Sequence, residues 1–166
     1  MPLTDLYSPK QIEVLKRSQG EDWHMLIGHG AVRAGKTNVN NDIFLQELIR
    51  IKEIATADGI DEPMYILGGV SSKTIQTNIL QELTNKYGLE FKFDKHNNFT
   101  LFGVKIIQTF TGTIAGLKSI RGMTAYGAYV NEATLANKEV FDEIIKRCSG
   151  NGARIISDTN PDHPEH

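Results

Sequence analysis

The sequence predicts an α/β fold in which a mainly parallel central sheet has helices on both faces and one antiparallel hairpin. Short apolar runs alternate with longer segments whose apolar residues recur every three or four positions, as in strands joined by crossover helices. Residues 64–70 form a continuous apolar run, typical of a strand buried on both faces of a parallel sheet. A glycine-containing loop at 30–37 lies between an apolar run and an amphipathic segment. We expect residues 1–166 to form a single domain.

Breaker and capping residues set the bounds of the expected elements. Pro9 suits the first turn of a helix, Ser71 can cap the helix that follows it, and Gly88 can end that helix. The expected elements, in chain order, are a short helix from Ser8, a strand at 24–28, a helix at 37–55, a strand at 64–70, a helix to Tyr87, a hairpin at 91–107, a strand at 126–130, a helix at 137–148 and a strand at 154–157.

The expected hairpin pairs two segments on either side of a polar turn. Residues 91–94 alternate apolar with polar positions, the polar stretch 95–98 is typical of a turn, and a largely apolar segment follows at 99–107. We therefore predict that 91–94 pairs with 99–107 in antiparallel fashion.

Residues 30–37 complete the phosphate-binding pattern G-x-x-x-x-G-K-[ST] between an expected strand and an expected helix. Backbone N–H groups of such a loop surround an anion, the lysine reaches the terminal phosphates and the threonine hydroxyl faces Mg²⁺. The predicted binding residues are Gly30, Ala31, Val32, Arg33, Ala34, Gly35, Lys36 and Thr37. The pattern predicts that the chain binds a nucleoside triphosphate, with Lys36 also active in catalysis.

A second candidate site follows the apolar strand at 126–130. Asn131 and Glu132 come directly after it, where ligands of a parallel sheet bind. Glu132 is the candidate base that orients or deprotonates the attacking water. Aspartate is the usual residue at the position of Asn131, and an amide contributes only a dipole to the surroundings of a metal. We therefore expect Asn131 to contact the metal side of the site with weaker Mg²⁺ affinity.

Phosphoryl transfer also needs positive charge near the transition state, and two arginines are candidates. Arg33 lies inside the phosphate-binding loop and is placed to act within its own chain. Arg121 precedes Gly122 in a loop and is placed to reach the nucleotide of a neighbouring subunit. The sequence leaves the choice between them open.

Composition limits the class of protein. A net charge of −2 indicates no general nucleic-acid-binding surface, so DNA contacts require local basic patches or other subunits. A single cysteine, Cys148, forms no internal disulfide and is expected to be a packed residue near a helix end. We find no signal peptide or apolar membrane span and expect a cytoplasmic protein.

Together these motifs resemble the ATPase domain of the large terminase subunit, the DNA-packaging motor of tailed bacteriophages and prophages. The resemblance extends along the chain and is closest to the PBSX-type prophage branch. The segments that carry it are Pro9–Gln11, the loop 30–37 with its internal arginine, Ser119–Gly122, Tyr129–Ala133 and Ser157–Pro161.

The resemblance implies an ASCE-type P-loop ATPase, with a strand inserted between the phosphate-loop strand and the strand before Glu132. It implies ATP and Mg²⁺ as cofactors. Gln11 matches the glutamine that contacts adenine, with Tyr7 a stacking partner, and Thr159 and Asn160 match the coupling motif that relays hydrolysis to movement. It further implies double-stranded DNA, the portal protein and the small terminase subunit as partners, a homo-oligomeric ring, and the cytoplasm of a bacterial host.

Family members continue into a nuclease domain, whereas this chain ends just past the coupling motif. We therefore expect ATP hydrolysis without nuclease activity. Alternatives remain open: a helicase- or recombinase-like DNA-dependent ATPase, a small-molecule kinase, or a nucleotide-gated binding module that has lost hydrolysis with the change to Asn131. A kinase is disfavoured because no arginine-rich lid segment is found.

Overall fold

The computed structural model describes residues 25–28 and 36–158. Its elements are β1 (Met25–Gly28), α3 (Lys36–Ala57), β2 (Met64–Gly69), α4 (Ser72–Ile75), the π-helix η2 (Gln76–Leu80), α5 (Gln81–Tyr87), β3 (Phe99–Leu101), β4 (Val104–Phe110), the 3-10 helix η3 (Ile114–Ser119), β5 (Gly127–Val130), the 3-10 helix η4 (Ala133–Leu135), α6 (Lys138–Arg147) and β6 (Arg154–Asp158). The strand at 24–28, the helix at 37–55 and the last three expected elements are confirmed to within two residues at each end.

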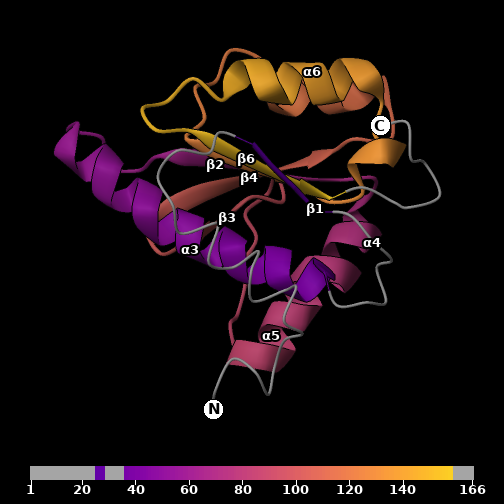
Figure 1. Cartoon of the computed structure of the whole chain (residues 1–166), viewed down its shortest axis with the longest axis horizontal. Coiled ribbons are helices and arrows are strands. Elements are labelled where there is room, and N and C mark those ends of the chain that lie inside the picture. The colour runs from indigo at the N-terminus through magenta and orange to yellow at the C-terminus, as the bar shows by residue number, and fades with distance from the viewer. Residues whose placement is uncertain (1–24, 29–35, 159–166) are drawn as a thin grey trace.

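The six strands form one sheet in the order β1-β6-β5-β2-β4-β3 (Figure 1). All neighbours are parallel except β3 and β4, so the predicted mainly parallel α/β sheet is confirmed. β6 lies between β1 and β5. This is the inserted strand that the family resemblance implies between the phosphate-loop strand and the strand before Glu132.

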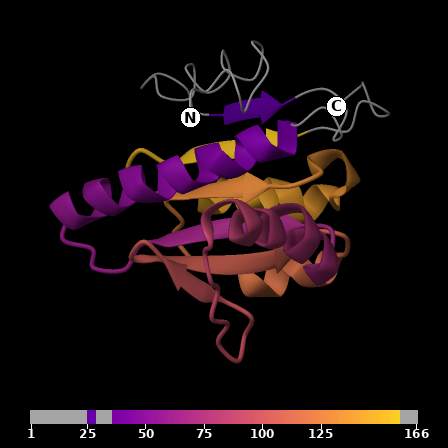
Figure 2. The same ribbon diagram turned by 90° about the horizontal axis from the view of Figure 1, so that it is seen from below.

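Helices cover both faces of the sheet. α3, α4 and α5 lie on one face and α6 on the other, with α3 running back along the strands at a tilt (Figure 2). Alternate residues of β5 and β6 divide the core accordingly. Tyr129 and Ile156 pack with α3, whereas Val130 and Ile155 pack with α6. By the same alternation, the side chains of Asn131, directly after β5, and Asp158, at the end of β6, point toward α3.

The antiparallel hairpin is present, but its predicted pairing is wrong. β3 pairs with β4 through the turn Phe102–Gly103, and residues 91–94 form no strand. Both turn residues have positive φ, 53° and 78°, as a two-residue type I′ hairpin requires. Phe91 packs its ring against Phe99 at 5.1 Å between centroids, so its apolar character reflects burial beside β3 and not pairing.

The predicted helix after β2 runs from Ser72 to Tyr87 but is not regular. The Ser71 hydroxyl accepts the Thr74 N–H at 3.2 Å, and Gly88 ends the helix with φ of 70°, so both predicted boundary residues are confirmed. Between them, residues 76–80 adopt π-helical geometry. π-Helical turns inside α-helices are rare and recur at functional sites.

A buried ion pair joins α3 to β6 at the end of the sheet away from the β1–α3 connection. Arg154 lies 3.3 Å from Glu47, and both side chains are about 95% buried. Arg50 also pairs with Glu47 and donates to the carbonyl of Gly152. Among the helices of the described part of the chain, none is long and apolar enough to cross a membrane.

Candidate functional site

The carboxyl ends of β5 and β6 bring two buried polar side chains together. Asn131 follows β5 and Asp158 ends β6, and each is only 1% exposed. Because Val130 is level with Ser157 across the parallel pair, Asn131 and Asp158 are lateral neighbours. The Asn131 Nδ2 amide donates to Asp158 Oδ2 at 3.2 Å. The predicted strand-end site therefore contains a carboxylate that belongs to the next strand.

A second asparagine reaches this pair from the π-helix. Asn78 lies in η2 and donates its Nδ2 to Asn131 Oδ1 at 2.9 Å and, more weakly, to Glu132 Oε1 at 3.5 Å. The π-helical turn thus places an amide donor at the ends of β5 and β6. Asn78 connects the helix after β2 to both residues of the predicted pair.

The predicted catalytic base has an unusual backbone. Glu132 is in the left-handed region, with φ of 54° and ψ of 53°, and is partly exposed. Its N–H donates to Asp158 Oδ1. Left-handed geometry is strained for a residue with a Cβ, and such strain is found where surrounding contacts impose it. Asp158 and Asn78 supply two of those contacts, and these contacts fix the position of Glu132 at the end of β5.

The N-terminal part of α3 is tied to the same edge. Asn41 accepts the Tyr129 hydroxyl at 2.7 Å and donates to the backbone carbonyl of Asn78 at 3.0 Å. Its Nδ2 also lies 3.3 Å from Glu82 Oε2. Through these bonds, the helix that follows the phosphate-binding loop packs on the strand ends. A helix N-terminus favours anions, which suits a phosphate at this edge.

Burial controls the protonation of the groups beneath this edge. Burial raises the pKa of Tyr129 well above its usual value, and the negative charge of Asp158 adds to this effect. Tyr129 is therefore a permanent hydroxyl donor to Asn41. Burial likewise raises the pKa of Glu82, while the hydrogen bond from Asn41 acts in the opposite direction.

The structure places only some of the predicted residues. Asn131 and Glu132 are brought together at the sheet edge, and the backbone of Lys36 and Thr37 opens α3. The remaining loop residues Gly30, Ala31, Val32, Arg33, Ala34 and Gly35, the adenine candidates Tyr7 and Gln11, and the coupling residues Thr159 and Asn160 lie outside the described residues. Their predicted roles stay predictions.

Arg121 follows an element on the other face of the sheet from the helix α3. It is exposed in the turn after η3, with its N–H bonded to the Leu117 carbonyl at 3.2 Å. η3 packs on β4 and α6, on the face of the sheet opposite α3. β1 and β4 are separated by β6, β5 and β2, which is about 19 Å at the usual ~4.8 Å per strand. Arg121 therefore follows an element that packs on the opposite face of the sheet from α3, over a strand that lies four positions from β1.

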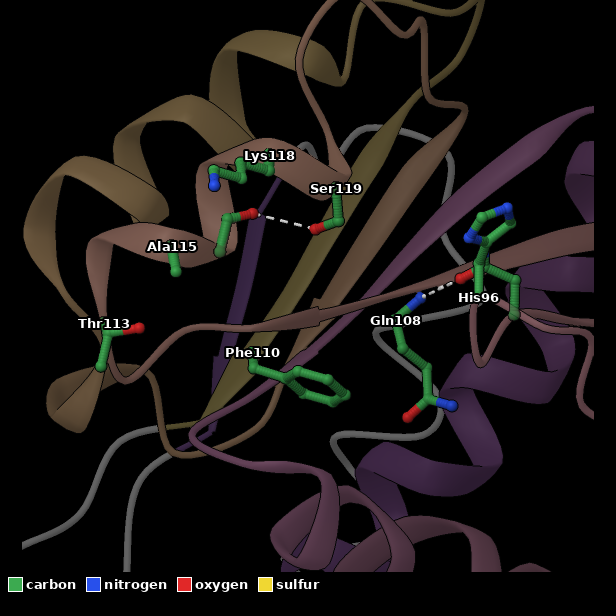
Figure 3. Close-up of a pocket in the computed structure, with 9 residues that line it drawn as sticks. His96, Gln108, Phe110, Thr113, Ala115, Lys118 and Ser119 are labelled. Carbon is green, nitrogen blue, oxygen red and sulfur yellow. Dashed lines mark hydrogen bonds between the residues drawn. The ribbon is translucent and has the colours of Figure 1, made fainter.

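A separate pocket of about 460 Å³ lies between β4 and η3, close to Arg121 in sequence. Figure 3 shows Gln108 and Phe110 of β4 on one side and Ala115 and Lys118 of η3 on the other. Its lining residues are His96, Asn98, Gln108, Phe110, Thr113, Ala115, Gly116, Lys118 and Ser119. None of them is a predicted nucleotide-binding residue, so this pocket is distinct from the strand-end site.

Asp158 and Asn78 are site residues that the sequence analysis does not single out. Asp158 has a detectable signal: it ends a buried strand, as Asn131 follows one, and parallel strands align their ends. Asn78 has none, because a π-helical turn leaves no simple periodicity in the sequence. In the described part of the chain, no group of three or more His, Cys, Asp or Glu side chains forms a metal cluster. A metal at this edge would depend on few carboxylates, as Mg²⁺ bound to nucleotide phosphates does.

No protein-family profile matches the chain, and no curated protein sequence matches it. Solved structures do. The large terminase from a thermophilic bacteriophage matches with a TM-score of 0.74 and 20% identity over 93% of this chain and 39% of that one. The same terminase in complex with ADP matches with a TM-score of 0.69 and 21% identity, over 92% and 38% of the two chains. The large terminase ATPase domain of Thermus phage P74-26 matches with a TM-score of 0.55 and 12% identity, over 93% and 69%.

This chain therefore spans about two fifths of the first of these terminases, and its sequence is distant from all three. What the three share with it is the arrangement of strands and helices. The chain has the fold of the ATPase domain of phage large terminases.

Proposed function

We propose that this chain is the ATPase domain of a large terminase subunit, and that it hydrolyses ATP to move double-stranded DNA into a procapsid. One observation carries the proposal. The strand that leads into the G-x-x-x-x-G-K-[ST] loop and the strand that precedes Asn131 and Glu132 end at the same side of the sheet, with β6 between them. A phosphate-binding loop and a carboxylate able to activate water are the two parts that ATP hydrolysis needs.

The proposed roles combine that arrangement with what the family resemblance implies. The loop from Gly30 to Thr37 binds the phosphates, with Lys36 at the terminal ones, and Glu132 orients and deprotonates the attacking water. Thr37 and Asn131 are the residues proposed to face Mg²⁺, which, when bound with the nucleotide, would neutralise charge on the transferring phosphoryl group. Tyr7 and Gln11 are proposed to contact adenine. Arg33 in cis, or Arg121 of a neighbouring subunit, supplies positive charge to the transition state.

The proposed setting is that of the packaging motor. Thr159 and Asn160 come after β6 and are proposed to relay hydrolysis to movement. The proposed partners are double-stranded DNA, the portal protein, the small terminase subunit and further copies of the chain in a ring, in the cytoplasm of a bacterial host. Assignment to the PBSX-like branch and the lack of nuclease activity in residues 1–166 are part of the same proposal.

A nucleotide-gated binding module is the second candidate, because Asn131 replaces the usual metal-side aspartate. Such a module binds nucleotide but does not turn it over. The two candidates differ in the role of Glu132. An ATPase needs its carboxylate as a base, whereas a module that does not hydrolyse ATP does not.

The test replaces Glu132 with glutamine. Glu132→Gln keeps the shape and the contact with Asn78 but removes the base, so we expect ATP hydrolysis to fall by about a hundredfold or more. Binding of fluorescent ADP, measured by anisotropy, is expected to stay within about threefold of the starting value, because ADP binding uses the loop and not the base.

Glu139→Gln is the matched control, because Glu139 is an exposed carboxylate in the first turn of α6. It should hydrolyse ATP at the unaltered rate. Absence of hydrolysis by the unaltered chain in single-turnover conditions, with ADP bound, would favour the binding module. Equal hydrolysis by Glu132→Gln would remove Glu132 from its proposed role.

A further inference from the structure

Asp158 lies on the strand next to β1, which leads into the predicted phosphate-binding loop, whereas Asn131 lies one strand further away. Asp158 is paired in register with Gly28, the last residue of β1, and is level with Asn131 on its other side. β6 lies directly between β1 and β5. The carboxylate of Asp158 is thus one strand, about 4.8 Å, closer to the start of the loop than Asn131 is.

The hydrogen bonds fix which way each amide faces. The carboxylates of Glu132 and Asp158 only accept hydrogen bonds when ionised, so the NH₂ groups of Asn78 and Asn131 face them. The carbonyl oxygen of Asn131 then accepts from Asn78 at 2.9 Å. Asn131 therefore presents a donor to Asp158, and its one side-chain acceptor is already engaged by Asn78.

Asn131 and Asp158 are complementary as a neutral hydrogen-bond donor and a carboxylate acceptor. An aspartate at position 131 would put a second carboxylate oxygen at the 3.2 Å now spanned by the amide bond. Two carboxylates this close repel each other unless a cation lies between them. The neutral amide of Asn131 avoids this repulsion and donates a hydrogen bond to Asp158 instead. From the sequence alone, the site has an amide, Asn131, where an aspartate would face the metal. The structure shows that the adjacent strand β6 brings a carboxylate, Asp158, to the same place.

Burial supports a role for this carboxylate beyond packing. Asp158 is 1% exposed, and an ionised carboxylate is costly to bury unless hydrogen bonds or a cation compensate it. Its contacts with Asn131 Nδ2 and the Glu132 N–H both orient it at the ends of β5 and β6, under the first turns of α3. The predicted phosphate-binding loop connects β1 to α3, so the proposed function puts the phosphates of the nucleotide on this side of the sheet.

We propose that Asp158 supplies, from β6, the carboxylate charge that favours Mg²⁺ with the nucleotide, and that Asn131 is the neutral amide that holds it there. The acidic pair of this site is therefore Asp158 and Glu132, on neighbouring strands. The inference rests on the proposed ATPase function and assigns its metal-side charge to a different residue.

A charge exchange in the whole chain tests it. The variants are Asp158→Asn, Asn131→Asp and the double variant, with fluorescent ADP affinity measured in EDTA and in excess Mg²⁺. Mn²⁺ bound in the presence of ADP is measured separately by electron paramagnetic resonance. For Asp158→Asn, we expect the increase in ADP affinity that Mg²⁺ produces to be smaller by about tenfold or more, because loss of a residue that supports a metal site typically has an effect of this size. The ADP affinity measured in EDTA should change little.

We expect Asn131→Asp alone to lower the thermal unfolding midpoint, because it juxtaposes two carboxylates. The double variant, with the acid on β5 and the amide on β6, should regain both the midpoint and most of the Mg²⁺-dependent affinity. Asp142→Asn and Asn85→Asp are the matched controls, since both residues are exposed, and each should behave as the unaltered chain.

The outcomes separate the two proposals. If the unaltered chain binds no ADP, the proposed function fails, and the inference fails with it. If it binds ADP and Asp158→Asn keeps the full effect of Mg²⁺ and Mn²⁺, the function stands and the inference is overturned. A double variant no better than either single variant would also overturn it, because exchange of the two groups should restore the pair.

Discussion

Glu132, the proposed base, has a backbone conformation that disfavours any residue with a Cβ atom. Its φ of 54° and ψ of 53° are accessible to glycine at little cost but cost other residues roughly 1–2 kcal/mol. The contacts from Asp158 and Asn78 hold it there. A carboxylate at this position is thus retained against the local conformational preference, as expected of a functional residue.

This strain gives a prediction about stability. Glu132→Gly should be more stable than Glu132→Ala by about 1 kcal/mol, because only glycine adopts the left-handed conformation freely. The measurement is the free energy of unfolding in urea. The control is the same pair at Glu53, an exposed position inside α3, where glycine should instead be less stable than alanine by about 1 kcal/mol. Equal stabilities of the two Glu132 variants would show that the backbone there is unstrained.

At the residue scale, the sequence predicts the polar residues at the end of a strand better than those that a neighbouring element brings to it. Asn131 and Glu132 are predictable because they come directly after an apolar run. Asp158 requires the order of the strands, which depends on long-range pairing. Asn78 requires the rotation that a π-helical turn gives to its side chain, and local spacing does not encode that rotation.

At the scale of elements, the sequence predicts where helices begin and end better than it predicts which strands pair. Ser71, Gly88 and the start of the last helix lie as their residue types indicate. The hairpin is displaced because alternation at 91–94 arises from Phe91 and Phe93 packing on Phe99, at 5.1 and 5.6 Å between ring centroids. Alternate side chains that contact one ring and strand pairing leave the same pattern in a sequence.

Asn137 gives a prediction for the start of α6. Its Oδ1 accepts the N–H groups of Glu139 at 2.9 Å and Val140 at 3.2 Å, which otherwise lack partners in the helix. Asn137→Ala should therefore lower the free energy of unfolding by about 1 kcal/mol, whereas Asn137→Asp, which still accepts both bonds, should not. Urea unfolding of the two variants measures this, and an equal loss in both would assign the effect to another contact of Asn137.

At the scale of the whole molecule, the order of the strands separates two residues that the sequence places only eleven positions apart. Glu132 lies at the carboxyl edge on the α3 face, and Arg121 lies after η3, which packs on β4 at the other side of the sheet. This arrangement supports action of Arg121 on a neighbouring subunit. It does not bear on Arg33, which lies outside the described residues.

Mixing experiments test the assembled protein. A chain with Arg121→Ala and a chain with Glu132→Ala should each be inactive, and mixed assemblies should recover part of the ATP hydrolysis, because one interface then combines an intact arginine with an intact base. The rate is measured against the mixing ratio. Co-assembly is established first by size-exclusion chromatography with light scattering. Co-assembly without any recovery would assign the role to Arg33.

The cross-strand bond between Asn131 and Asp158 also constrains how such a sequence can change by mutation. A single base change converts an asparagine codon to an aspartate codon or the reverse, so either position is easily altered alone. Yet each single step produces a site with two adjacent acids or with none on the metal side. Exchange of the two residues therefore passes through an impaired intermediate, and lineages with the acid on β5 or on β6 should tend to keep it there.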